Sequence, residues 1–159
     1  MEVFMFERRL ILFLLMLPVL AFAPSALQAQ TAEELDIMLQ ADTVSGSQAS
    51  RFVLGAADLL PEGVSGASAE RAAFDMAASN GWITAAASDA LTMKETAFLI
   101  MKAFDLKGGM MYTLLKNPRY AYREMIYRRF IQGQTDQNMK VTGPKLLQIL
   151  DRTMGFTDD

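Results

Sequence analysis

The feature that most constrains the fold is a short pattern that occurs three times along the chain. The clearest copy begins at Leu91, continues with Thr92 and Glu95, and runs into an apolar segment that ends near Leu106. A threonine followed three residues later by a glutamate predicts a helix N-terminus, because each side chain can bond a backbone N–H group that the first turn leaves free. The apolar residues behind it recur at three- and four-residue spacing, which predicts one broad buried face. They are Ala97, Phe98, Ile100, Met101 and Phe104.

The other two copies lie on either side of this one. Val44–Ser45 precedes Leu91–Thr92 by 47 residues, and Gln48 completes a second pair of capping side chains. Val141 follows the leucine of the middle copy by 50 residues, and here Pro144 supplies a different signal for the first helical turn. The pattern therefore predicts three related helices that begin at equivalent positions.

Each of these helices is preceded by another helical segment, so the repeating unit is a helix, a connection and a second helix. One helical pair cannot bury its own apolar faces, so we expect an all-α fold, a small bundle of three helix–loop–helix repeats. Glycines are expected to end the helices, at Gly81, Gly108, Gly133 and Gly155. The three units are expected at about residues 31–60, 68–107 and 117–155, with first helices at Ala32–Leu39, Ser68–Ser79 and Pro118–Gln132.

Several residues of the middle unit match a known kind of module. They are Gly81–Ile83, a short linker, Leu91–Thr92, Glu95 and the aliphatic helix that ends near Leu106. In these residues the unit resembles an S-layer homology (SLH) module, and the flanking units resemble it less. The resemblance implies a pseudo-threefold bundle of three such modules, a fold that typically anchors exported proteins to envelope polysaccharide or peptidoglycan.

One position of the family pattern differs in this chain. The family's second helix usually opens with a threonine, an arginine, a variable residue and a glutamate, and the arginine helps to bind anionic glycan. Met93 stands where that arginine would be, and Gly46 and Gly143 stand there in the other two copies. The resemblance therefore supports the fold more than it supports glycan binding.

The N-terminal residues have the pattern of an export signal. Arg8–Arg9 precedes an almost wholly apolar run, Leu10–Ala23, which is followed by a short segment with small residues. We predict a signal peptide over residues 1–29, cleaved after Ala29 or alternatively after Ala26. The other interpretation is a retained membrane anchor, but the run is shorter than the roughly 20 residues that a spanning helix needs.

Export would leave a single domain of residues 30–159 in the periplasm or cell envelope, with no stable membrane span. Thr31 with Glu34 predicts that its first helix begins almost at once. The chain has no cysteine, so we expect no disulfides and no lipid on a cysteine. Its formal net charge of −3 does not suggest a nucleic acid partner.

The composition also limits the chemistry. The absence of His and Cys excludes Ser–His–Asp triads, Cys–His pairs and the usual zinc sites. Carboxylate chemistry or a Ser–Lys arrangement remains possible, and a glycan hydrolase would need two carboxylates at a defined separation. The better-placed ones are Glu70, Asp75, Glu95, Asp105 and Glu124. We expect a non-enzymatic protein with no catalytic residues, no metal and no cofactor.

The most unusual composition lies between Lys116 and Phe130, which holds five basic residues and one acidic residue. Asn117 followed by Pro118 predicts a helix start there. The expected inward face consists of Ala121, Tyr122, Met125, Ile126 and Phe130. Tyr120, Arg123 and Tyr127 fall on a different face, with Arg119 nearby.

Two interpretations of that face compete. In the first, the arginines and tyrosine hydroxyls bind an anionic glycan or the carboxylates of a partner, since arginine suits charge-assisted, two-pronged hydrogen bonds. In the second, the arginines are solvated and paired with Glu124 and nearby acids, and the tyrosines edge the core. A similar choice applies to Trp82, which could stack on a sugar ring but is more readily explained as a core residue.

Two functions follow from these patterns. The first is an exported module that binds peptidoglycan or anionic envelope polysaccharide, with Arg119, Tyr120, Arg123, Tyr127 and Trp82 as candidate ligand-binding residues. The second is a periplasmic interaction subunit that docks on an envelope or outer-membrane protein complex. A polar, charged rim around the basic helix would favour the glycan, and a broad exposed apolar patch would favour the protein partner.

Overall fold

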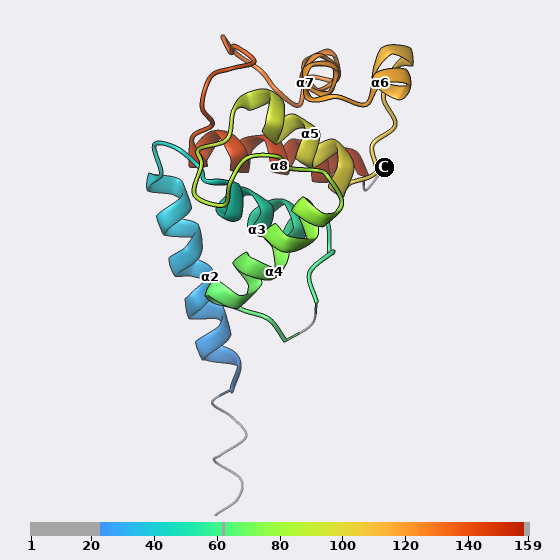
Figure 1. Ribbon diagram of the computed structural model, residues 1–159. Coiled ribbons are helices and arrows are strands. Elements are labelled where there is room, and N and C mark those ends of the chain that lie inside the picture. The colour runs from blue at the N-terminus through green and yellow to red at the C-terminus, as the bar shows by residue number, and fades with distance from the viewer. Residues whose placement is uncertain (1–22, 62, 158–159) are drawn as a thin grey trace, which may run out of the picture. The chain divides into compact units, whose positions relative to one another are not determined.

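The computed structural model describes residues 23–61 and 63–157 and shows an all-α protein (Figure 1). Its described residues form seven helices and no strand. The helices are α2 (Ala23–Gln40), α3 (Gly46–Ala56), α4 (Gly66–Ser79), α5 (Met93–Ala103), α6 (Met110–Leu115), α7 (Pro118–Tyr127) and α8 (Gly143–Thr157). The chain divides into two compact units, one up to Asp36 and one from Ile37 onward, and the hydrophobic core belongs to the second.

The backbone segments that precede α3, α5 and α8 are joined in a closed ring of hydrogen bonds. The N–H group of Val44 donates to the carbonyl of Val141 at 2.9 Å, and the N–H group of Leu91 donates to the carbonyl of Val44 at 2.9 Å. The N–H group of Val141 closes the ring on the carbonyl of Leu91 at 3.1 Å. All three side chains are fully buried. These are the residues that the spacings of 47 and 50 align in the sequence, and in space they occupy equivalent places.

Two of the three helices after this ring begin as predicted. In α3 the N–H group of Ser45 donates to the side chain of Gln48 at 3.1 Å, and in α5 that of Thr92 donates to Glu95 at 2.8 Å. Both are capping boxes. In α8 the equivalent residues are Thr142 and Lys145. The hydroxyl of Thr142 accepts a hydrogen bond from the N–H group of Lys145 at 3.3 Å, but the lysine side chain cannot accept the returning bond, so the capping box is incomplete.

Four helices end in the same way. A residue with positive φ follows the last turn, and the next residue donates its N–H group to a carbonyl five residues earlier, which is the Schellman arrangement. The positive-φ residues are Asp58, Gly81, Asp105 and Arg129, and the returning bonds join Leu59 to Leu54, Trp82 to Ala77, Leu106 to Met101, and Phe130 to Met125. The predicted stop at Gly81 is confirmed, because α4 ends at Ser79. The stops predicted at Gly108 and Gly133 were wrong, because α5 and α7 end earlier, at Ala103 and Tyr127.

Two further helix boundaries differ from the prediction. Helix α2 does not begin at Thr31 but at Ala23, since alanine, leucine and glutamine favour helix and Pro24 is tolerated in a first turn. Helix α8 continues through Gly155 to Thr157, because one glycine costs a helix only about 1 kcal/mol. Residues 1–22 lie outside the described residues, so signal cleavage remains a prediction.

The helix pairs place α6 and α7 at one side of the core. Helix α3 packs against α4, and α5 packs against α7, while α3 also contacts α5 and α8. Figure 1 shows α6 and α7 beyond α5, on the side away from α4. Among the described helices, α6 packs mainly on α7, which leaves one of its faces without a closely packed neighbouring helix. Across residues 23–61 and 63–157, no helix is both long and apolar enough to cross a bilayer.

Candidate functional site

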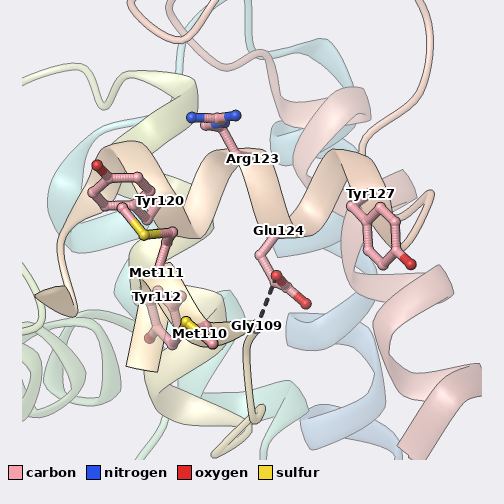
Figure 2. Close-up of a pocket in the computed structure, with 8 residues that line it drawn as sticks. All are labelled: Gly109, Met110, Met111, Tyr112, Tyr120, Arg123, Glu124 and Tyr127. Carbon is pink, nitrogen blue, oxygen red and sulfur yellow. Dashed lines mark hydrogen bonds between the residues drawn. The ribbon is translucent and has the colours of Figure 1, made fainter. Parts of the chain in front are cut away.

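Helices α6 and α7 enclose a shallow groove of about 280 Å³ (Figure 2). Three of the candidate residues, Tyr120, Arg123 and Tyr127, line it together. The other lining residues are Gly109, Met110, Met111, Tyr112 and Glu124. Figure 2 shows the two methionines at one end, Tyr127 at the other, and Arg123 on the edge of α7 away from Glu124. The groove therefore combines apolar, aromatic and charged groups.

Helix α7 presents these residues because its opposite face is fixed in the core. Asn117 caps its start by accepting a hydrogen bond from the N–H group of Tyr120 at 3.2 Å. The hydroxyl of Tyr122 donates to the carbonyl of Thr135 at 2.8 Å, and Ala121 and Met125 are fully buried. Ile126 was expected on this inward face, but its side chain is 41% exposed. A ten-residue helix with a narrow buried stripe leaves Ile126 at the edge of that stripe.

Glu124 joins the two helices. Its Oε2 accepts a hydrogen bond from the N–H group of Gly109 at 3.0 Å, and its Oε1 accepts one from Arg128 Nε at 2.8 Å. Arg128 also donates through Nη2 to the carbonyl of Lys107. Burial raises the pKa of Glu124, but the hydrogen bonds and the charge of Arg128 outweigh it and hold the pKa below its ordinary value. A charged Glu124 thus fixes the start of α6 against α7.

One aromatic side chain, Tyr112, anchors helix α6 to the hydrophobic core. Tyr112 is buried, and the burial, together with the charge of Asp105, raises its pKa to about 12. The phenol therefore stays neutral at physiological pH and serves as an apolar anchor. Because Tyr112 and the Glu124 contact fix this short helix, its remaining side chains need not reach the core.

The outer side of α6 is apolar and open to solvent. Met110 is 85% exposed and Leu114 is 76% exposed, and Met111 and Leu115 are about half exposed. Tyr127, on the neighbouring helix, is 83% exposed. The sequence does not indicate this exposure, since the run from Met110 to Leu115 has no polar face beyond Thr113 and such a run is typical of a buried segment. Clustered exposed apolar side chains of this kind mark interaction sites in soluble proteins.

The arginines of this region divide into two kinds. Arg128 is paired with Glu124, as the solvated-face interpretation requires. Arg119 and Arg123 are exposed, and within the described residues neither forms an ion pair or a hydrogen bond. Arg119 does not line the groove but lies one helical turn before Arg123 on the same side of α7. Two cations are thus left to meet a ligand or partner. We name the combined surface of α6 with Arg119, Arg123 and Tyr127 the α6–α7 surface.

Trp82 lies elsewhere. It follows α4, is only partly exposed, and packs against the hydrophobic core. It does not line the groove between α6 and α7. The core interpretation therefore fits Trp82 better than sugar stacking at this site.

Three positions of this chain align with the glycan-binding arginine of SLH modules, and all three are enclosed. Met93 is buried, and a side chain in place of Gly143 would put its Cβ atom 1.6 Å from the carbonyl oxygen of Met38. A Cβ atom at Gly46 would lie 2.8 Å from the carbonyl oxygen of Ala86. No long cationic side chain could be accommodated at either glycine without moving backbone. These positions therefore offer no surface charge for a glycan.

The carboxylates considered for catalysis have mostly structural contacts. Glu95 caps α5, Asp105 ends it with positive φ, and Glu124 holds α6. Glu70 and Asp75 line a second groove, of about 380 Å³, between α4 and the start of α3. There Glu70 accepts a hydrogen bond from the hydroxyl of Ser47.

Comparison with protein-family models finds no matching family, and comparisons with curated proteins and with solved structures find no significant match.

Proposed function

We propose that this protein is a non-enzymatic interaction subunit of the cell envelope that binds another polypeptide through its α6–α7 surface. The observation that carries the proposal is the exposure of Met110 and Leu114 beside the unpaired Arg119 and Arg123. Methionine, tyrosine and arginine, which this surface contains, are also enriched in protein interfaces relative to the rest of the protein surface.

The rest of the chain fits this role as an export signal and a scaffold. The predicted signal peptide over residues 1–29 would deliver the protein to the periplasm. We infer that the three helix–loop–helix units close into a pseudo-threefold, SLH-like bundle. The ring formed by Val44, Leu91 and Val141 and the repeated helix ends support that inference. Such a bundle would hold α6 and α7 rigidly in place.

A protein partner suits the surface better than a glycan does. A glycan presents hydroxyl groups and needs many hydrogen-bonding partners, whereas α6 exposes thioethers and branched carbon chains. Methionine side chains adapt their shape to apolar partners and bind water poorly. The enclosed positions at Met93, Gly46 and Gly143 remove the cation that the SLH family uses for glycan.

The test is the native size of the protein in gently solubilised envelopes. Wild type should migrate in a complex larger than one chain, and Leu114→Ser should release it. Met139→Ser is the matched control, because Met139 is a similarly apolar, exposed side chain on the loop before α8. The proposal is wrong if wild type migrates as a single chain, or if Leu114→Ser and Met139→Ser have the same native size.

Glycan binding remains the second candidate, favoured by the way Tyr120, Arg123 and Tyr127 line one groove. Co-sedimentation with purified sacculi tests it, with Arg119→Ala/Arg123→Ala as the variant. Pelleting of wild type but not of the variant would assign the surface to peptidoglycan. If neither pellets, glycan binding through this site is excluded.

A further inference from the structure

The exposed apolar side chains of α6 form one stripe along the helix. Met110 and Leu114 lie four residues apart, and Met111 and Leu115 repeat that spacing one residue further on. With 3.6 residues per turn, the four side chains fall within about 140° of the helix circumference. Tyr112 points away from the stripe and is buried in the core. The core therefore takes Tyr112 and leaves the apolar stripe in solvent.

Cations lie on two sides of α6. Arg123 stands at the groove between α6 and α7, with Arg119 one turn before it (Figure 2). Lys107 and Lys116 line a smaller hollow, of about 170 Å³, on another side of α6. All four side chains are exposed, and within the described residues none forms an ion pair or a hydrogen bond. Residues 102–130 hold seven basic and two acidic residues in a chain of net charge −3, so the surroundings of the stripe are positive.

The spacing of the surface residues favours a helical partner. Arg119 and Arg123 are separated by four residues, or about 6 Å along the axis of α7. The apolar stripe and these arginines belong to two neighbouring helices, so a partner must present two rows of side chains side by side. A helix has a face wide enough for two rows, whereas an extended strand presents one row on each face. The described residues also contain no strand to which an extended segment could add.

We propose that the α6–α7 surface binds an acidic amphipathic α-helix of a partner protein. Apolar side chains of this helix pack on the stripe and enter the groove of about 280 Å³, and carboxylates one turn apart bond Arg119 and Arg123. The inference rests on the proposed function and names the chemistry of the partner. A two-fold contact between two copies of the surface would place cations opposite cations, so the occupant is a different segment.

Synthetic peptides of about 18 residues test the inference, a length at which an isolated helix can form. The first set carries Leu, Met or Phe four residues apart, with glutamates four residues apart beside that apolar face. The second set has the same composition but places its glutamates two residues apart, on opposite sides of the helix. The third set replaces each glutamate by lysine. Fluorescence anisotropy with protein purified from cells that express the full chain should show saturable binding of the first set, and at least about tenfold weaker binding of the others.

Protein variants test the site. Arg119→Glu/Arg123→Glu should bind the glutamate peptides at least about tenfold more weakly than wild type and the lysine peptides more tightly. A gain for the lysine peptides also shows that the variant is folded. Arg71→Glu/Lys94→Glu is the control, because it makes the same change in net charge on α4 and α5, outside the α6–α7 surface. It should bind all three sets as wild type does.

Each other outcome overturns the inference. If the first set fails to bind, or binds no more tightly than the second, while wild type still migrates in a larger complex in envelopes, the proposed function stands and the partner is not an acidic helix. Migration of wild type as a single chain removes the proposed function and this inference with it. Binding to vesicles of anionic phospholipid, abolished by Arg119→Glu/Arg123→Glu, without binding of any peptide, would assign the surface to a membrane and remove both.

Discussion

The centre of this protein and its α6–α7 edge use similar residues in opposite ways. At the centre, Leu91 is fully buried and its backbone N–H and carbonyl groups both bond within the ring. At the edge, Leu114 has the same side chain but leaves three quarters of it in water, with 76% exposed. The centre also encloses its glycines under neighbouring backbone, whereas the edge exposes methionines and unpaired arginines.

The difference separates residues that hold the fold from residues that remain for function. Burial of apolar side chains and satisfied backbone groups explain why the centre folds. Neither explains the edge, since solvent-exposed Met110 and Leu114 contribute little to folding. Selection for something other than stability accounts for them best, and binding is the simplest such cause. Substitutions in the two regions should therefore separate stability from assembly.

The largest effect is expected at the centre, for Gly143→Ala. The new Cβ atom would lie 1.6 Å from the carbonyl oxygen of Met38, so backbone must move at a cost of about 3 kcal/mol or more. Gly155→Ala is the control, because no atom lies within 4 Å of its Cβ position and alanine favours helix. Urea unfolding followed by circular dichroism measures both. A Gly143→Ala variant as stable as wild type would contradict the close approach of Gly143 to the backbone of Met38.

The next largest effect is expected for Leu91→Ala. Removing a fully buried side chain at the ring should lower the free energy of unfolding by about 3 kcal/mol, from lost burial and a residual cavity. The same urea titration applies, with Leu114→Ala as the matched substitution at the edge. If Leu91→Ala and Leu114→Ala lower the free energy of unfolding equally, the proposed difference between the centre and the edge is wrong.

A smaller effect is expected for Glu124→Gln, which weakens the joint between α6 and α7. The lowered pKa means that the charged carboxylate stabilises the fold above its ordinary pKa of 4.5, and that this stabilisation is lost as pH falls through the lowered value. The free energy of unfolding of wild type should exceed that of the variant by about 1 kcal/mol at neutral pH. This difference should disappear in acid, where the carboxylate is protonated. A gap that persists unchanged in acid would mean that charge is not the cause. Asp151→Asn, on the exposed side of α8, should change little.

The smallest effect on stability is expected for Leu114→Ser at the edge. Its side chain is already exposed, so the free energy of unfolding should change by less than about 0.5 kcal/mol. The larger complex expected in envelopes should nevertheless be lost. A variant that unfolds at much lower urea than wild type would show that Leu114 supports the fold and that its exposure was misinterpreted.

Much of the fold could be predicted from the chain because its signals are local. The caps at Ser45 and Thr92 and the alignment of Val44, Leu91 and Val141 depend on residue type and spacing alone. The end of α4 could be predicted because a glycine, Gly81, takes the positive φ there. The ends of α5 and α7 could not be predicted, because Asp105 and Arg129 adopt a positive φ that glycine usually takes.

The site was predictable only in part. The amphipathic spacing of α7 placed Tyr120, Arg123 and Tyr127 on one face, and they do line one groove. The exposure of Met110 and Leu114 was not predictable, since it depends on which side of α6 the buried Tyr112 and the Gly109–Glu124 hydrogen bond leave outward. Periodicity cannot orient a six-residue helix that is apolar on nearly every side.

Site-specific photo-crosslinking in intact cells tests the central claim most directly. A photoreactive residue would replace Leu114 in one strain and Met139, an exposed apolar residue outside the α6–α7 surface, in another, each in the full chain. A docking surface on α6–α7 predicts a discrete protein adduct from position 114 and none from position 139, with the adduct lost when Arg119 and Arg123 are also changed to Glu. No adduct from position 114, or adducts of equal yield from both positions, would contradict the claim.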